Sequence, residues 1–281
     1  MGDTCQLPAF QHSKCDINAA LKNLLQEIHS LLLNEQYRQP ANLAAFGSCF
    51  FYQGQIRSPG NPSEKSKQSL RMFVWRASKP LPLEERQSTP EALLVKEILT
   101  NYRPMSSVLT FYANQRRILR KHLPPKTDVL VVDASQGSSL PPTILSPGRH
   151  DGKIGFCGDK RRFNVAESRT RKEFIVVCHE SMVDGSCGSA PAKFWNTMYE
   201  VWKSKNLVYD IDTNGNLSYD LQQAFATDLE YSAEDVCKSV TPYHRYQAKL
   251  VGRIFPDMEA PGLPLEAVVG DAQDNDEDDP M

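Results

Sequence analysis

The sequence lacks several patterns whose absence narrows the class of protein. Its 281 residues contain no apolar run near the roughly 18 residues that a membrane-spanning helix needs. Its seven cysteines show no CxxC spacing, which disfavours a zinc site or a disulfide framework. With 40% hydrophobic and 23% charged residues, the composition is typical of a soluble globular protein. We therefore expect an intracellular protein, cytoplasmic or nuclear, that makes no membrane contact and keeps its cysteines reduced.

A further absence concerns nucleotide chemistry. The sequence contains no GxxxxGK[ST] segment, the glycine-rich loop whose backbone amides and lysine hold nucleotide phosphates. No strand ending in an Asp-Glu pair, which would hold Mg²⁺, precedes Gly2. We therefore expect this chain to hydrolyse no ATP by itself, and we assign no metal ligand.

The net charge of −2 conceals an uneven distribution. The end of the chain carries six acids within nine residues: Asp271, Asp274, Asp276, Glu277, Asp278 and Asp279. Removing these six leaves a charge of +4 on the rest of the chain. A mildly basic body with an acidic tail suits nucleic acid, although a solubilising or partner-binding role for the tail is an alternative.

Short apolar strands alternate with helical segments along most of the chain. A helix is also expected from Leu21 to Leu32, capped by Asp16, and another begins at Ser88–Glu91 by a capping box or by Pro90. The expected strands are 71–76, 107–111, 128–133, 143–145 and 174–178, and the later helices are 114–123, 162–171 and 193–204. Continuous apolar strands separated by helices predict an α/β fold with a mainly parallel sheet covered on both faces.

Five segments in a fixed order carry more information than any of them alone. They are GDTCQLPA at residues 2–9, QYR at 36–38, FGSCFFYQGQI at 46–56, VDASQGSS at 132–139 and NVAESRTRK at 164–172. In this order and spacing they resemble the back half of a superfamily 1 nucleic-acid helicase of the Upf-like, 5′→3′ type. The resemblance implies a RecA-like second motor domain of the P-loop NTPase type. The first half of the motor, with its phosphate loop and magnesium-binding acids, is expected to be absent from this chain.

The resemblance also implies a division of the chain. Residues 1–35 would be the end of the first RecA-like domain, and residues 36–205 the second RecA-like domain. A C-terminal extension at 206–260 with a β-hairpin and a disordered acidic tail at 261–281 would follow.

The catalytic positions of the family fall on three residues. Gln6 matches the glutamine of GDxxQLPP that senses the γ-phosphate, and Arg38 matches the phosphate-contacting arginine of QYRMHP. Arg169 matches the arginine finger of VAxTRA, followed by Arg171 as the second arginine. A guanidinium suits such a site because its planar fork pairs two phosphate oxygens at once. The sequence departs from the family at QYRQPA, where Met-His-Pro is lost.

The remaining assignments follow from the same resemblance. Nucleotide contacts would come from adenine stacking and from the fifth motif, at Tyr37, Gln136, Gly137 and Arg149. Ser139 replaces the glutamate of VDxxQGxE, so one polar contact of that motif is missing. Single-strand backbone contacts would come from the fourth and fifth motifs, at Thr110, Tyr112, Gln115, Ser135 and Ser138.

Together these positions predict the C-terminal domain of an ATP-dependent RNA or DNA helicase. ATP and Mg²⁺ would be cofactors only if the missing first domain were supplied, for which a protein partner is one source. Single-stranded RNA or DNA would bind weakly, through its backbone. The alternatives are a non-catalytic nucleic-acid- or protein-binding module derived from a helicase, or a truncated gene product.

One segment outside these motifs resembles a calcium loop. Asp210 to Ser218 fits the first nine positions of an EF-hand, but position twelve is Leu221 instead of the bidentate glutamate. Asn214-Gly215 is also the preferred turn pair of a β-hairpin, flanked by strand-like residues 208–212 and 216–220. The sequence favours the hairpin over a calcium site.

Overall fold

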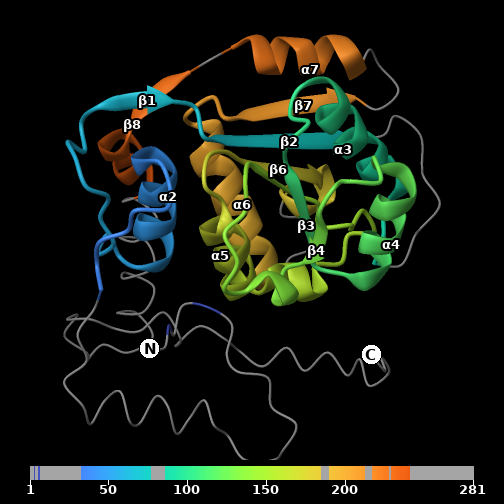
Figure 1. Cartoon of the computed structure of the whole chain (residues 1–281), viewed down its shortest axis with the longest axis horizontal. Coiled ribbons are helices and arrows are strands. Elements are labelled where there is room, and N and C mark those ends of the chain that lie inside the picture. Colours follow the sequence, from blue (N-terminus) through green and yellow to red (C-terminus); the bar gives the residue numbers. More distant parts are fainter. Residues whose placement is uncertain are drawn as a thin grey trace, which may run out of the picture.

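A six-stranded parallel sheet forms the centre of the computed structural model, which describes residues 3, 6, 33–76, 86–184, 190–212, 217–227 and 229–240 (Figure 1). The strand order is β4-β3-β5-β6-β2-β7, and every pairing in this sheet is parallel. The strands are β2 (Leu70–Arg76), β3 (Ser107–Thr110), β4 (Val129–Val131), β5 (Thr143–Leu145), β6 (Phe174–His179) and β7 (Val208–Asp212). The predicted α/β fold with a parallel sheet is confirmed.

Helices cover both faces of this sheet (Figure 1). They are α2 (Ala41–Phe51), α3 (Thr89–Asn101), α4 (Ala113–His122), α5 (Lys160–Arg169), α6 (Ala190–Lys203) and α7 (Leu217–Ala226). Alternate residues of β2 enter two separate cores, because successive side chains of a strand point to opposite faces. Met72 joins the core under α2, α5 and α6, whereas Phe73 joins the core under α3, α4 and α7.

Capping residues explain where two of the helices begin. The Ser88 side chain accepts a hydrogen bond from the Glu91 amide at 3.4 Å, and Pro90 occupies the first turn of α3. The start predicted for this helix is therefore confirmed. Asp159 caps α5 by accepting from the Arg161 amide at 2.9 Å.

The segment after residue 205 differs from its prediction. Val208–Asp212 does form a strand, but it pairs in parallel with β2 at the edge of the main sheet. The stretch expected to be the second hairpin strand is instead the start of α7 at Leu217, so the hairpin prediction is wrong. The turn pair Asn214-Gly215 and the predicted helix at 21–32 lie outside the described residues. The boundary predicted near 205 therefore cuts through the sheet domain.

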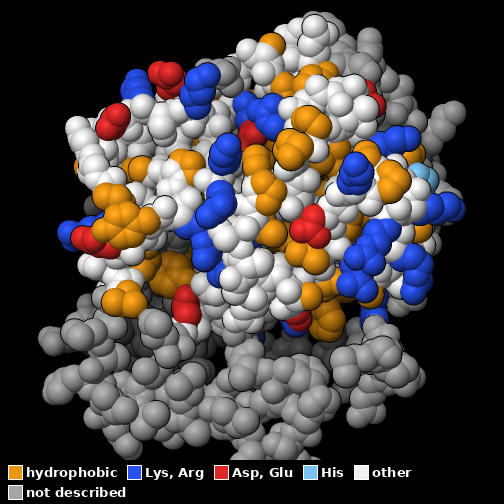
Figure 2. Space-filling view, in the orientation of Figure 1, with side chains coloured by type: hydrophobic (Ala, Val, Ile, Leu, Met, Phe, Trp, Pro, Cys, Tyr) orange, Lys and Arg blue, Asp and Glu red, His pale blue; other side chains and the backbone are white. Residues whose placement is uncertain are grey.

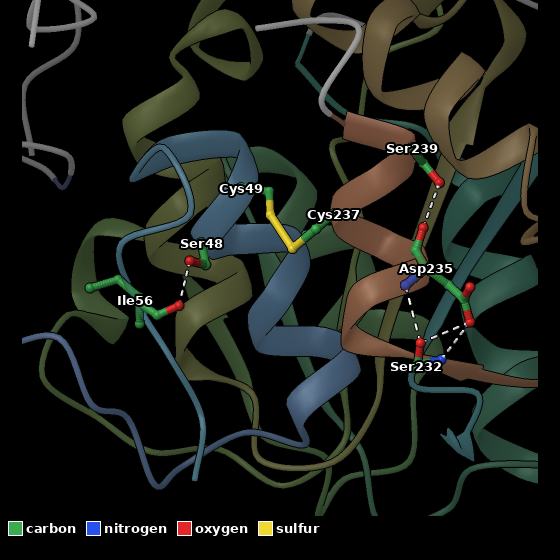
Figure 3. The surroundings of a disulfide bond; sticks show 7 residues. All are labelled: Ser48, Cys49, Ile56, Ser232, Asp235, Cys237 and Ser239. Atoms are coloured by element: carbon green, nitrogen blue, oxygen red, sulfur yellow. Dashed lines mark hydrogen bonds between the residues drawn. A yellow bond between two sulfur atoms is a disulfide. The ribbon is translucent and has the colours of Figure 1, made fainter. Parts of the chain in front are cut away.

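A second, two-stranded sheet lies beside the main domain. β1 (Lys65–Lys67) pairs antiparallel with β8 (Glu230–Ser232), and a helix at 233–240 follows. This helix lies beside α2, where Cys49 and Cys237 form a disulfide with their Cα atoms 5.7 Å apart (Figure 3). The expectation that the cysteines are all reduced is wrong for this pair. Cys49 and Cys237 meet because segments far apart in the sequence pack together, and the spacing of the cysteines along the chain does not reveal such contacts.

Within the described ranges, no helix has the length and apolar character that crossing a membrane requires.

Candidate functional site

Three residues far apart in the sequence meet at the C-terminal end of α5. Arg169, the last residue of α5, donates from Nη2 to Gln6 Oε1 at 3.2 Å across 163 positions. Arg38 donates from Nη1 to the Ser168 carbonyl oxygen at 2.8 Å. The three predicted catalytic positions, Gln6, Arg38 and Arg169, therefore lie around one point of the structure.

Uncharged groups hold the Arg169 guanidinium. Besides Gln6, its acceptors are the carbonyl oxygens of Val165 at 3.3 Å and Ser138 at 3.4 Å, and the Ser168 hydroxyl at 3.1 Å. Burial lowers the pKa of Arg169, and the positive charge of Arg38 lowers it further. The charge of Asp3 acts in the opposite direction. Among the described residues, the hydrogen-bond acceptors of both guanidinium groups are uncharged, so the two groups can bind an anion.

The segment that carries Arg38 is fixed by a side chain next to it. Gln36 Oε1 accepts from the backbone amides of Arg38 at 3.0 Å and Gln39 at 2.9 Å. Tyr37 projects from this turn with 75% of its surface exposed, and its hydroxyl donates to Glu35 at 2.7 Å. An exposed ring that precedes Arg38 in the chain can stack on a planar ligand.

A buried carboxyl also reaches this point, which the sequence did not predict. Gln39 donates from Nε2 to the Glu167 carbonyl oxygen at 2.9 Å and to Glu167 Oε1 at 3.1 Å. Glu167 is 1% exposed, and its burial raises the pKa of the carboxyl to about 8. The raised pKa reduces the negative charge that this carboxyl presents to Arg169 at neutral pH. Gly47 of α2 leaves room for it, because a Cβ there would stand 2.8 Å from Glu167 Oε2.

A tyrosine links this point to the beginning of the chain. Tyr52 donates to Asp3 Oδ2 at 2.7 Å and accepts from Asn164 Nδ2 at 2.9 Å. Asp3 belongs to the same segment as Gln6, so two contacts tie that segment to α2 and α5.

A known protein family matches most of the region that forms this site. The sequence profile of a family described as an AAA domain matches residues 17–181, more than half of the chain. The chain belongs to the Upf-like superfamily 1 helicase family.

Known relatives resemble most of this chain. Regulator of nonsense transcripts 1 of Dictyostelium discoideum is 27% identical over 249 residues, covering 75% of this chain and 18% of that protein. DNA polymerase alpha-associated DNA helicase A of Saccharomyces cerevisiae is 26% identical over 253 residues, covering 71% and 36%. DNA-binding protein SMUBP-2 of Mus musculus is 26% identical over 220 residues, covering 65% and 22%. The chain thus spans 18% to 36% of the length of these relatives.

The side chains that the helicase motifs assigned to a nucleic-acid strand are mostly buried. Thr110, Gln115 and Ser135 have no exposed surface, and Tyr112 is 6% exposed. Gln115 accepts from the Ser88 amide at 2.7 Å and donates to the Ser146 hydroxyl at 2.8 Å, which joins α3, α4 and the end of β5. These side chains hold loops together, and their placement does not support direct contact with an external strand.

The fifth-motif residues form a turn after β4. Ser135 donates to the Val132 carbonyl oxygen at 2.7 Å, and the partly buried Ser138 donates to the Ser135 carbonyl oxygen at 2.6 Å. Gln136 and Gly137 are exposed, and Gly137 has a φ of +88°, which favours glycine. The Ser138 carbonyl oxygen accepts from Arg169, so this turn borders the arginine site.

Arg149 contacts a different set of groups. It donates from Nε to the Lys153 carbonyl oxygen at 3.2 Å and lies 3.6 Å from Asp151. Its guanidinium stands over the Tyr112 ring, 5.3 Å from the centroid. The structure therefore joins Arg149 to Tyr112 and the loop at 151–156, and not to Arg38 or Arg169 within the described ranges.

A second buried carboxyl orders the loop before Arg149. Glu91 accepts from the Ser146 hydroxyl at 2.6 Å and the Gly148 amide at 2.9 Å, and from Trp75 Nε1 at 3.4 Å. Burial raises its pKa to about 7. The sequence predicts Glu91 only at the start of a helix, because nothing in the neighbouring residues indicates that its carboxyl points inward.

The calcium-like segment has a simpler arrangement. Asp210 lies in β7, and its carboxylate accepts from Arg76 on β2 at 2.9 Å. In the part of the chain that the structure describes, no group of three or more His, Cys, Asp or Glu residues is placed to hold a metal ion. Residues 213–216 of that segment lie outside the described ranges.

Proposed function

We propose that this chain is the phosphate-sensing half of an ATP-dependent nucleic-acid helicase motor. The observation that supports this role best is the convergence of Gln6, Arg38 and Arg169 at the end of α5. Residues from three separate motifs meet there, and the hydrogen-bond acceptors of both guanidinium groups among the described residues are uncharged, which suits a triphosphate.

The donors at this point fit a nucleotide. Arg169 and Arg38 would hold γ-phosphate oxygens, Gln6 would orient the same group, and Tyr37 would stack on the base. Magnesium-bound ATP would supply a phosphoryl group for transfer to water. A phosphate loop and carboxylates from a first RecA-like domain would hold the metal ion. Arg38 and Arg169 would then act by holding two positive charges next to the phosphate oxygens on which negative charge develops in the transition state.

Nucleotide binding by the purified chain tests this role. We expect a fluorescent ATP analogue with Mg²⁺ to bind weakly, and Arg169→Ala to weaken it by about 10- to 100-fold, the range for a charge-assisted hydrogen bond. Arg169→Lys should recover part of the affinity. Arg117→Ala, on the exposed face of α4, is the matched loss of one arginine and should leave the affinity unchanged. Equal effects of the two alanine variants would refute the assignment.

Hydrolysis gives a second, separate measurement. We expect no turnover above background from this chain alone, and turnover once a first motor domain from a relative is added. Nucleic-acid-stimulated hydrolysis by the chain alone that disappears in Arg169→Ala would contradict this expectation.

A non-catalytic binding module derived from the helicase is the second candidate. The Gln39–Glu167 pair favours such a module, because the polar groups of these two side chains next to the site already bond to each other within the protein. In a module, single-strand affinity should be the same with and without ATP and the first domain. In a motor, ATP should change that affinity.

A further inference from the structure

An exposed aromatic ring covers a tyrosine that the sequence had assigned to nucleic acid. Phe156 lies in the short 3₁₀ helix η2 (Gly155–Gly158) and stacks on Tyr112, with ring centroids 5.8 Å apart and planes 11° apart. Tyr112 is 6% exposed, whereas Phe156 is 51% exposed. The accessible ring at this point is therefore Phe156.

Backbone contacts fix the position of the Phe156 ring. Its amide donates to the Tyr112 hydroxyl at 2.9 Å. The preceding Gly155 has a φ of +48°, and a Cβ there would stand 2.6 Å from the Tyr112 hydroxyl. Only glycine allows η2 to approach Tyr112 this closely, so the loop is built to hold the ring on the tyrosine.

An arginine adds a second planar group to this surface. The Arg162 guanidinium lies 4.6 Å from the Phe156 centroid. Two carboxylates hold it in place: Asp133 accepts from Nε at 3.0 Å and from Nη2 at 3.2 Å, and Asp159 accepts from Nη1 at 3.5 Å. A ring and a guanidinium that are already immobilised lose little conformational entropy when a planar ligand stacks on them.

Unneutralised positive charge begins next to this stack. Tyr112 is the N-cap of α4, so the helix starts where Phe156 rests. In the described ranges, no ion pair forms at the basic residues of α4 and the turn after it: Arg116, Arg117, Arg120, Lys121 and Lys126. Figure 2 shows Lys and Arg side chains gathered over α4. Cations without carboxylate partners suit the phosphates of a nucleic-acid backbone.

A single exposed apolar residue needs no explanation, but Phe156 combines an immobilised ring, a guanidinium and a neighbouring cationic helix. We propose that Phe156 and Arg162 form a stacking platform for one unpaired nucleobase of a single strand whose phosphates follow α4. This inference rests on the nucleic-acid binding proposed above, and it identifies a contact made through a base.

Fluorescence anisotropy with a short labelled single strand tests the platform. Phe156→Leu should weaken binding by roughly 5- to 150-fold, the range for stacking of one base on an aromatic ring. Phe156→Tyr should restore it. A strand of the same length with abasic sites should bind the wild type and Phe156→Leu equally. Met105→Ala, which removes another exposed apolar side chain, should leave the affinity unchanged.

The cationic helix has a different signature. Arg117→Gln should weaken binding to both strands equally and reduce the slope of log affinity against log salt by about 1. Thermal unfolding of each variant at the wild-type temperature confirms that the fold is intact.

The outcomes separate the two proposals. If the wild type binds the strand and Phe156→Leu binds equally well, the platform is refuted while nucleic-acid binding stands. If Phe156→Leu weakens binding to the abasic strand as much as to the normal one, the ring does not stack on a base. If the wild type binds neither strand, both proposals fail.

Discussion

The buried carboxyl of Glu167 should make the stability of this protein fall as the pH rises. Burial raises its pKa in the folded protein from 4.5 to about 8. Between these values the folded state keeps a proton that the unfolded state releases. Stability that depends on this group is therefore fully present below about pH 4.5 and is lost as the pH rises toward 8.

The expected size follows from the same two values. One pH unit is worth 1.36 kcal/mol for a single group, so the interval from 4.5 to about 8 corresponds to on the order of 5 kcal/mol. At pH 7 the loss should be about 3 kcal/mol. Glu167→Gln keeps the shape and the hydrogen-bonding capacity of the protonated side chain but cannot ionise. We expect it to match the wild type near pH 5 and to be more stable by a few kcal/mol above pH 8.

Urea unfolding at a series of pH values measures this difference. The quantity to plot is the free energy of unfolding of Glu167→Gln minus that of the wild type, because Glu91 titrates in both proteins and cancels. Glu64→Gln, at an exposed position, is the matched control, and a pH-dependent difference of this size should be confined to Glu167→Gln. Parallel curves for Glu167→Gln and the wild type across this range would show that Glu167 does not bind a proton on folding.

Three further substitutions test the packing around the site. Gly47→Ala should destabilise the folded protein by about 1–3 kcal/mol in thermal melts, because the new Cβ would meet the Glu167 carboxyl at 2.8 Å. Adding Glu167→Ala should restore stability, and a double variant that is not rescued would contradict the clash. Cys49→Ser should cost about 2–5 kcal/mol, as should reductant on the wild type, and a wild type insensitive to reductant would count against the disulfide. Gly148→Ala should lower the free energy of unfolding more than Gly152→Ala. Both glycines have φ near +75°, but only a Cβ at Gly148 would meet a buried side chain, that of Gln115, at 2.7 Å. Equal losses of stability would assign the whole effect to backbone strain.

Local patterns predicted the central sheet but not its edge. The apolar runs at 107–111 and 174–178 became β3 and β6 with ends within one residue, because buried parallel strands have a continuous apolar signature. The hairpin was predicted from the turn preference of Asn214-Gly215, whereas β7 pairs with β2, more than a hundred residues earlier. Turn chemistry cannot report such a partner.

At the site too, the motifs predicted some residues, whereas other contacts depend on how the chain packs. The order of the motifs predicted that Gln6, Arg38 and Arg169 act together, and the structure brings them together. Gln39 belongs to the QYRQPA departure and Glu167 occupies the unspecified position of VAxTRA, and only the fold shows that their side chains form a hydrogen bond. Several polar motif residues were expected to contact a nucleic-acid strand, but they are buried and form hydrogen bonds to loops of the protein. The same side chains can bond either to a phosphate backbone or to buried backbone groups, so the sequence does not distinguish the two roles.

The disulfide between α2 and the helix at 233–240 also determines how the protein would carry a mechanical load. A pull applied to the chain before Cys49 and after Cys237 passes through one covalent bond and bypasses the sheet. The 188 positions between the two cysteines would add nothing to the extension until the bond is reduced, which hides about 600 Å of contour length. Under oxidising conditions, the part of the chain between the two cysteines would therefore behave as a short rigid link.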